Sequence, residues 1–152
     1  ILVNLIRFKK WPPNYQKLIL MFQKEVADKI VAKVNTKNYG RLSIITNWRL
    51  KVVKRINISK TCFYPVPKVD SSVLVFEPIE NKSIVIKDIK NLEKITHYFF
   101  SGKRKMINKA FSKIFKNYKS ISRELKIDLS FRPSQLKEND YYKIVEYFEA
   151  KK

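Results

Sequence analysis

The sequence has few of the residue types on which cofactor loops and catalytic clusters depend. It contains two glycines, one histidine and one cysteine among 152 residues. A phosphate-cradling or nucleotide-binding turn needs several closely spaced glycines, and Gly40 and Gly102 lie far apart. His97 lies in the apolar stretch ITHYFF, which favours a structural role over a Ser-His-Asp or Cys-His site. Cys62 has no partner for an intrachain disulfide, which indicates a reducing, cytoplasmic setting and gives no sign of a metal cluster.

Long hydrophobic runs are also missing. No apolar run approaches the roughly 18 residues that a membrane-spanning helix needs, and the opening residues ILVNLIRF are soon interrupted by charge. They do not form a signal-peptide pattern. Because the chain begins at Ile1 instead of a methionine, we expect that a longer reading frame extends upstream.

Acidic residues are few compared with basic ones. There are 33 Lys and Arg against 13 Asp and Glu, a net charge of +20. Such self-repulsion is destabilising unless a polyanion offsets it. Nucleic acid is the favoured partner and an anionic membrane surface is the second candidate. An AT-rich genome would raise the lysine content as well, but it would not cluster the charges.

Hydrophobic periodicity predicts a sheet region followed by helices. Strands are expected at 18–22, 50–56 and 72–78, and the continuous apolar run LILMF predicts a strand covered on both faces. The first residues predict a helix end, and further helices are expected at 25–33 and after Gly40. From Lys87 onward only helical periods occur, at 88–100, 103–117, 120–126 and 139–150. Ser120 and Asn139 are the expected N-caps, and Pro133 marks a break. The fold class is therefore α/β, with a sheet domain at 1–86 and a helical domain at 87–152.

The segment FYPVPKVDSS, residues 63–72, enters the last predicted strand in an unusual way. Pro65 and Pro67 fix φ near −65° and donate no backbone hydrogen bond, so the segment cannot be helix interior or central strand. We predict a stiff, extended loop with Phe63 and Tyr64 at its upstream end. From these residues alone, the favoured interpretation is that the two rings cover the edge of the sheet and the prolines mark the entry to the strand.

The segment SGKRKMINKAFSKIFKNYK predicts an amphipathic helix with charge of one sign. At about 100° per residue, one side carries the apolar residues Met106, Ile107, Ala110, Phe111, Ile114 and Phe115. The other side carries the stripe Lys105, Lys109, Lys113 and Lys116. Solvated helix faces usually interleave Glu with Lys to gain favourable pairs, and this one does not. The stripe therefore predicts contacts with phosphates, against the alternatives of a bare solvated face or a membrane-surface helix.

Together, these stretches resemble one family over nearly the whole chain. The resemblance rests, in order, on LMFQKEVADKIVA, YGRLSI, FYPVPKVDSSV, FFSGKRKMINKAF and LKIDLSFRPSQL. They are similar to segments of the bacterial small-subunit ribosomal RNA adenine N6,N6-dimethyltransferases. The resemblance implies the C-terminal portion of a Rossmann-like methyltransferase sheet at 1–86, followed by a small all-α RNA-binding domain at 87–152. It also implies S-adenosylmethionine as the cofactor of the full-length enzyme and small-subunit RNA, or a 30S-type particle, as its partner, with no membrane and no metal.

The resemblance assigns a role to the proline-bearing loop. In the family this loop closes one side of the target pocket, and its first Phe stacks on the adenine that is methylated, a position that Phe63 takes here. An enzyme that modifies a base amine must take the base out of its stack and hold it against an aromatic face. The resemblance places the other loop residues Tyr64, Pro65, Pro67, Lys68 and Ser71 around this pocket. It implies RNA contacts for Arg41, Lys103, Arg104, Lys105 and Arg132, in addition to Lys109, Lys113 and Lys116. Arg41 could instead form a structural ion pair.

Two motifs of that family do not occur in this sequence. These are the cofactor loop of the form E-x-G-x-G and the catalytic tetrapeptide NLPY. By register the chain begins just after NLPY would end, so no cofactor-binding residue is expected in it, and the chain by itself is expected to be inactive. Two rival functions stay open: a non-catalytic RNA-binding or ribosome-assembly module, and a large-subunit RNA methyltransferase of the macrolide-resistance type.

Overall fold

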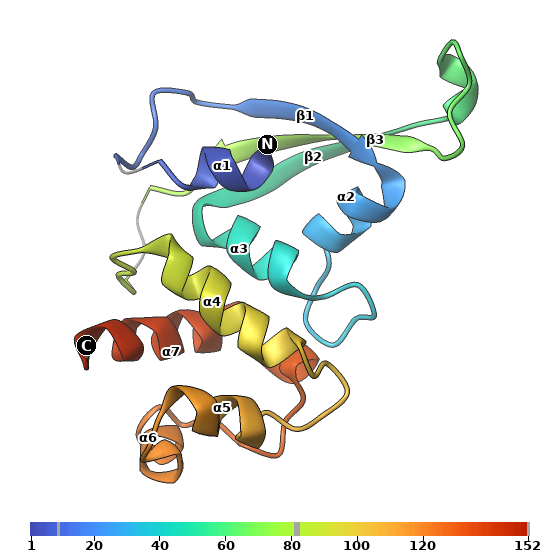
Figure 1. Cartoon of the computed structure of the whole chain (residues 1–152). Helices are drawn as coiled ribbons and strands as arrows, with labels where there is room; N and C mark the ends of the chain where they lie inside the picture. The colour runs from blue at the N-terminus through green and yellow to red at the C-terminus, as the bar shows by residue number, and fades with distance from the viewer. Residues whose placement is uncertain (9, 81–82, 152) are drawn as a thin grey trace.

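A computed structural model describes residues 1–8, 10–80 and 83–151. Its centre is a small antiparallel sheet with helices on one side (Figure 1). The three strands are β1 (Leu18–Gln23), β2 (Leu50–Ile58) and β3 (Ser71–Pro78), in the order β1-β3-β2. Both outer strands run antiparallel to β3, so β1 and β2 run parallel to each other. The chain between them must therefore cross over β3, which is the α/β arrangement that the sequence predicts.

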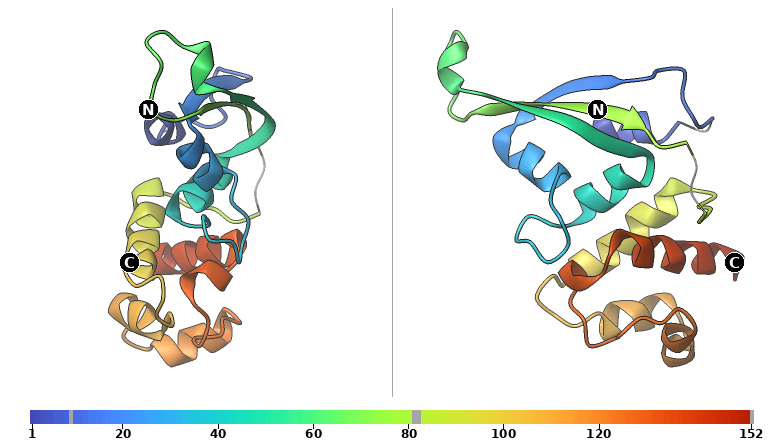
Figure 2. Two further views of the ribbon diagram at one scale, coloured as in Figure 1. Left: turned by 90° about the vertical axis from the view of Figure 1, so that its right-hand side faces the viewer. Right: turned by 180° about the vertical axis from the view of Figure 1, so that it is seen from behind.

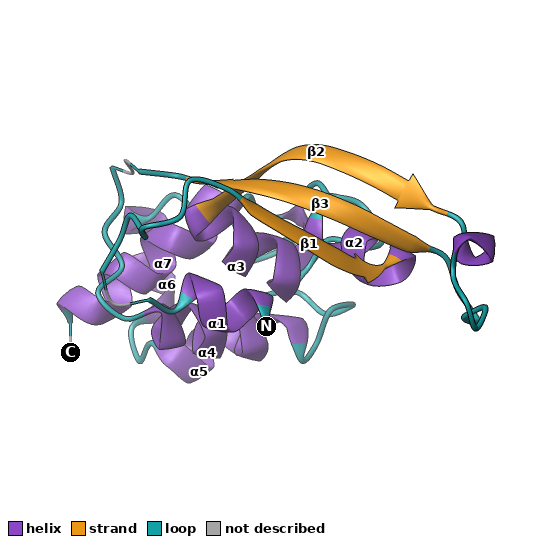
Figure 3. Cartoon of the chain, turned by 90° about the horizontal axis from the view of Figure 1, so that it is seen from above, coloured by secondary structure: helices purple, strands orange, loops and turns teal. Residues whose placement is uncertain are grey.

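One face of the sheet is covered by the helices of the first half of the chain, as the view from above shows (Figure 3). These are α1 (Leu2–Ile6), α2 (Lys24–Ile30) and α3 (Arg41–Arg49). Side chains of β3 alternate between the two faces, and Ser72, Leu74 and Phe76 are buried against the helices. The three predicted strands and the helices predicted at the start of the chain, at 25–33 and after Gly40 are confirmed, with boundaries shifted by a few residues.

The prediction that the LILMF strand is covered on both faces is wrong. Burial along β1 alternates, and the side chains of Ile19 and Met21 are 69% and 56% exposed. They stand on the face opposite the helices, opposite Val75 and Val73 of β3. A continuous apolar run does not reveal how many faces are covered. Within the part of the chain that the structure describes, no element packs over this second face.

The second half of the chain is helical, as predicted, but the basic helix is shorter than expected. Its helices are α4 (Ile89–Phe100), α5 (Asn108–Ile114), α6 (Tyr118–Glu124) and α7 (Glu138–Ala150). The prediction of a helix at 103–117 is wrong at the start of that range, because residues 101–105 form turns. The backbone N–H of Ile107 donates to the carbonyl of Phe131 at 2.8 Å instead of to the preceding turn. Because of this long-range hydrogen bond, α5 begins only after residue 107.

The two predicted N-caps are wrong as well. Asn117 precedes α6, so Ser120 lies inside that helix. Asn139 lies inside α7, where the Asp140 carboxylate accepts a hydrogen bond from the backbone N–H of Lys137 at 3.0 Å. Asp140, the third residue of α7, thus accepts a hydrogen bond from a backbone N–H that has no partner within the helix. The break at Pro133 is confirmed, because a short 3-10 turn, Pro133–Gln135, begins there.

Three buried tyrosines form hydrogen bonds in the core, and two of them, Tyr39 and Tyr142, join the sheet region to the helical region. The Tyr39 hydroxyl donates to the carbonyl of Leu136 at 3.0 Å, and the Tyr142 hydroxyl donates to the carbonyl of Ile44 at 2.9 Å. The Tyr141 hydroxyl donates to the carbonyl of Pro133 at 2.7 Å. Burial raises the pKa of all three phenols well above the ordinary value, which keeps them neutral donors. One continuous hydrophobic core therefore spans both regions, and the domain boundary at residue 86 stays a prediction.

Candidate nucleic-acid interface

The proline-bearing segment forms the tip of a hairpin that projects past the sheet (Figure 1, upper right). Residues 59–70 connect β2 to β3, which pair up to Ile58 and Ser71. The predicted loop is confirmed for residues 63–70, but it bends at 63–65 and 68–69 instead of being extended throughout. A 3-10 turn, Lys60–Cys62, precedes it, and β3 begins at Ser71. Tyr64 is fully exposed and Phe63 is half-buried. The exposure of Tyr64 argues against the reading in which this ring covers the edge of the sheet.

The base of this hairpin is tied to the end of β1. The backbone N–H of Lys60 donates to the Asp70 carboxylate at 3.0 Å, which closes the loop across its two ends. The backbone N–H of Lys24 donates to the carbonyl of Asp70 at 3.0 Å. Asp70 therefore joins the hairpin to the start of α2. Together with the fixed φ of Pro65 and Pro67, these bonds hold Phe63 in a defined place relative to β1.

The remaining residues predicted for the target pocket lie at this base. Lys68 is exposed and lines a cavity of about 420 Å³ between the hairpin and α2. Ser71 is the first residue of β3, where it pairs with Gln23 of β1 and Ile58 of β2. It therefore lies in the sheet, at the point from which the loop departs.

The predicted basic residues after α4 lie on an exposed turn. Lys103, Arg104 and Lys105 follow the end of α4, and the Lys103 ammonium donates to the backbone carbonyl of Lys37 at 2.6 Å. Lys103 thus also ties this turn to the loop between α2 and α3. Arg132 is exposed just before the Pro133 turn.

Arg41 is the first residue of α3, and its guanidinium faces α4. One of its nitrogens lies 3.5 Å from His97 Nδ1 and another lies 3.5 Å from the carbonyl of Glu93. Among the described residues it forms no ion pair. His97 is exposed, so it is not part of the core.

The predicted lysine stripe is divided by the shorter helix. Lys109 and Lys113 lie one turn apart on α5, whereas Lys105 lies on the preceding turn and Lys116 follows the helix. All four are exposed. The opposite side is apolar as predicted for Ile107, Phe111 and Phe115, which are buried. The prediction fails for Met106, which is 53% exposed because it precedes the helix.

Four further lysines were not singled out from the sequence. Lys24 and Lys60 line the same cavity as Lys68. Lys33 and Lys37 line a second cavity, of about 460 Å³, in the loop between α2 and α3. Asp28 borders both cavities. The contact between Lys103 and the Lys37 carbonyl links this second cavity to the turn after α4. Basic residues therefore extend from the hairpin base past α2 to that turn, on the side of the molecule that faces the viewer in the left view of Figure 2.

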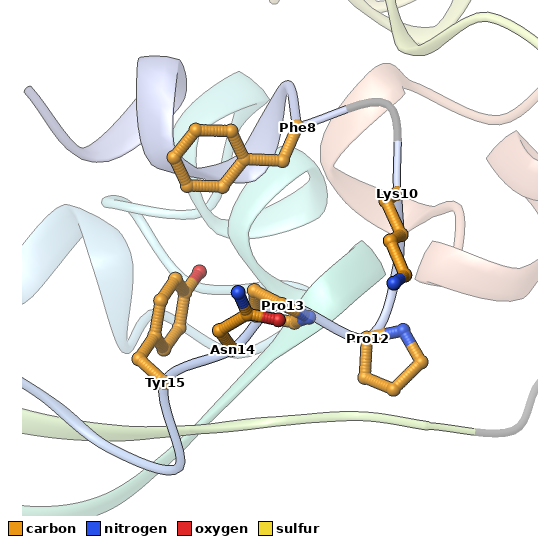
Figure 4. A pocket seen from close by; sticks show the side chains of 6 residues that line it. All are labelled: Phe8, Lys10, Pro12, Pro13, Asn14 and Tyr15. Carbon is orange, nitrogen blue, oxygen red and sulfur yellow. The ribbon is translucent and has the colours of Figure 1, made fainter.

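A cavity of about 520 Å³ lies at the other end of β1 (Figure 4). Its lining is mostly apolar and comes from the loop before β1, namely Phe8, Lys10, Pro12, Pro13, Asn14 and Tyr15. The six residues of β1 separate this loop from the hairpin base by about 20 Å. The cavity is therefore not part of the interface.

Neither of the two glycines faces open space that a cofactor could occupy. A Cβ added at Gly40 would meet the Phe100 ring at 3.6 Å, and one at Gly102 would meet Lys105 at 3.8 Å, so both glycines face side chains of this chain. Neither glycine therefore provides a cradle for S-adenosylmethionine, and no methyl-transfer step is assigned to these residues. Among the described residues no three His, Cys, Asp or Glu side chains gather as metal ligands, and no described helix is long and apolar enough to cross a membrane.

Comparisons with solved structures define the class. A dimethyladenosine transferase from Plasmodium falciparum superposes with a TM-score of 0.71 at 27% identity, over 92% of this chain and 59% of that one. The 23S rRNA methyltransferase ErmE superposes with a TM-score of 0.56 at 17% identity, over 91% of this chain and 56% of that one, a likeness of fold alone. The fold is that of the Rossmann-like methyltransferases.

Sequence comparisons then give the family. The profile described as "Ribosomal RNA adenine dimethylase" matches residues 4–150, and the chain belongs to this family. It is 49% identical over 135 residues to the ribosomal RNA small subunit methyltransferase A of Pelagibacter ubique, covering 89% of this chain and 51% of that protein. The protein of the same name from Mycoplasma mobile is 37% identical, over 88% of this chain and 52% of its own length. The chain thus spans about half the length of these relatives.

Proposed function

We propose that this chain is the RNA-binding, target-pocket portion of an S-adenosylmethionine-dependent enzyme that dimethylates N6 of two adjacent adenosines near the 3′ end of small-subunit ribosomal RNA. The main support is the rigidly anchored hairpin that presents Phe63 at the end of β1, next to exposed lysines. Its partner is the small-subunit RNA, free or in a 30S-type particle. Because that substrate is cytoplasmic in bacteria, we place the function in the cytoplasm.

In this proposal the chain's own residues bind and orient the RNA. The target adenine leaves its stack and rests on the Phe63 ring, an interaction of about 1–3 kcal/mol per base. Because Asp70 already holds the loop in place, little of this stacking energy is lost to the entropy cost of ordering the loop on binding. The lysines of the α4–α5 turn and of α5 contact phosphates and set affinity.

The methyl-transfer step needs residues that this sequence does not contain. The motifs E-x-G-x-G and NLPY, which the family uses for the cofactor and the target amine, are not among its 152 residues. We therefore propose that the 152-residue chain binds RNA by itself without transferring methyl groups. A large-subunit target has less support, because the curated relatives quoted above are small-subunit enzymes and the large-subunit enzyme shares only the fold.

The phosphate-binding role of the α5 region predicts a change in salt dependence. Replacing Lys105, Lys109 and Lys113 together by Gln removes three phosphate contacts, each adding about 0.7 to the log–log salt slope for single-stranded RNA. We expect the slope of RNA binding to become shallower by about 2. Titrations of a fluorescent small-subunit RNA fragment between low and moderate salt measure it.

A matched variant controls for the loss of charge alone. Lys51, Lys90 and Lys143 are exposed and lie outside the proposed contacts. Replacing these three by Gln lowers the net charge equally, and we expect it to change the slope much less. Equal changes in both variants, or no change in the first, would mean that the lysines of the α5 region are only solvated.

A further inference from the structure

We propose that the cavity at the base of the hairpin, lined by Lys24, Lys60 and Lys68, binds a phosphodiester of the RNA strand beside the base that stacks on Phe63. The proposal rests on the proposed function, because it names the contact that positions the substrate strand at the same site. Two of these lysines, Lys24 and Lys60, come from segments that no sequence pattern connects.

Three separate segments bring the lysines to one place. Lys24 begins α2, Lys60 begins the 3-10 turn after β2, and Lys68 lies on the returning side of the hairpin loop. The pairing of β3 with both other strands places the ends of β1 and β2 on either side of Ser71, the first residue of β3. The cavity between them holds about 420 Å³ and opens to solvent, enough room for a phosphate group and its sugar.

The charges in this cavity favour an anion. Its three carboxylates already have partners: Asp28 pairs with Arg55 at 2.7 Å, Glu25 pairs with Lys29 at 2.6 Å, and Asp70 accepts from the backbone of Lys60 at 3.0 Å. The ammonium groups of Lys24, Lys60 and Lys68 are exposed and have no hydrogen-bond or ion-pair partner within the described residues. The carboxylates are thus engaged while three cations are left for a ligand, and phosphate is the anion that a lysine cluster on an RNA-binding protein most commonly meets.

The cavity is also close enough to the ring to act on the same part of the strand. Lys60 precedes Phe63 by three residues, so their Cα atoms are at most about 11 Å apart. Asp70 ties Lys60 and Lys24 to one another through backbone bonds, so the distance from cavity to ring is fixed. A phosphate held there would set where the flipped base falls. The role is therefore positioning, distinct from the affinity supplied by the α5 region.

The test compares two readouts on the 152-residue chain. The probe is an RNA hairpin with two adjacent adenosines in its loop, one of them replaced by the fluorescent base 2-aminopurine. Replacing Lys24, Lys60 and Lys68 by Gln should make the log–log salt slope shallower by about 2 and abolish the fluorescence change that stacking on Phe63 produces. The Lys105, Lys109 and Lys113 variant should flatten the slope but keep the fluorescence change at saturating protein.

The possible results separate this inference from the proposed function. If the unmodified chain binds the probe, and the variant keeps both its slope and its fluorescence change, this inference alone is wrong. If the unmodified chain does not bind RNA, the proposed function fails and this inference fails with it. A second test uses the chain without substitutions and measures how fast its lysines are acetylated by a chemical reagent. Bound RNA should protect Lys24, Lys60 and Lys68 from acetylation but not Lys143. Equal reactivity of these three lysines with and without RNA would overturn the proposal.

Discussion

Replacing Phe63 by alanine in a chain that includes the complete methyltransferase sheet is expected to lower kcat/KM for methylation by roughly 5- to 150-fold, the equivalent of about 1–3 kcal/mol of base stacking. The affinity for RNA should change far less. The ring contacts the target base only after it has left its stack, whereas many phosphate contacts hold the RNA in either state. Single-turnover methylation assays and RNA titrations on the same variant measure the two effects.

Further substitutions distinguish the ring from the loop. Phe63→Trp keeps an aromatic face and should retain most activity, whereas Phe63→Leu keeps bulk without that face and should behave like alanine. Val66 lies exposed on the same loop, so Val66→Ala is the matched control and should leave methylation unchanged. Equal losses of methylation and RNA binding in Phe63→Ala would exclude the stacking role.

Replacing Phe99 by alanine is expected to lower the free energy of unfolding by about 3–5 kcal/mol, the usual cost of removing a large aromatic side chain from a core. Only 1% of Phe99 is exposed, and its ring meets Phe111 at 6.2 Å and Tyr141 at 5.4 Å between centroids. Domains of this size are stable by about 5–15 kcal/mol, so the loss is a large share of the total. Urea unfolding followed by circular dichroism measures it.

The neighbouring residue supplies the control for this prediction. Tyr98 is on the same helix but is 36% exposed, and Tyr98→Ala should cost less than about 1 kcal/mol. Because Tyr39 and Tyr142 join the sheet region to the helices, we also expect one transition for the whole chain. A Phe99→Ala loss no larger than the Tyr98→Ala loss would mean that the aromatic core does not hold the helical region together.

Much of the fold was predictable because it depends on local patterns. The apolar run in SVLVF predicted β3, and the period of IKNLEKITHYFF predicted α4. What sequence could not predict depends on distant partners. The start of α5 is set by a bond from Ile107 to Phe131, and the open face of β1 depends on which elements cover it. Neither feature has a signal in the local periodicity.

The candidate site was likewise predictable only in part. Pro65 and Pro67 predicted the loop, and the family resemblance gave Phe63 its role, which stays a prediction. Lys24 and Lys60 were missed because each stands alone in the sequence, and only the antiparallel pairing of the strands brings them to the cavity beside Lys68. No motif in the sequence could have joined them.

We propose that residues 1–152 form the RNA-binding part of a small-subunit adenine dimethyltransferase. The most direct test fuses residues 1–152 to the N-terminal half of the Pelagibacter ubique relative, which is 49% identical over the shared region. The fusion is incubated with S-adenosylmethionine and unmethylated ribosomal particles, and the RNA is analysed by mass spectrometry. We expect N6,N6-dimethyladenosine at two adjacent positions near the 3′ end of the small-subunit RNA. A folded, cofactor-binding fusion that leaves this RNA unmodified, or that methylates large-subunit RNA instead, would contradict the claim.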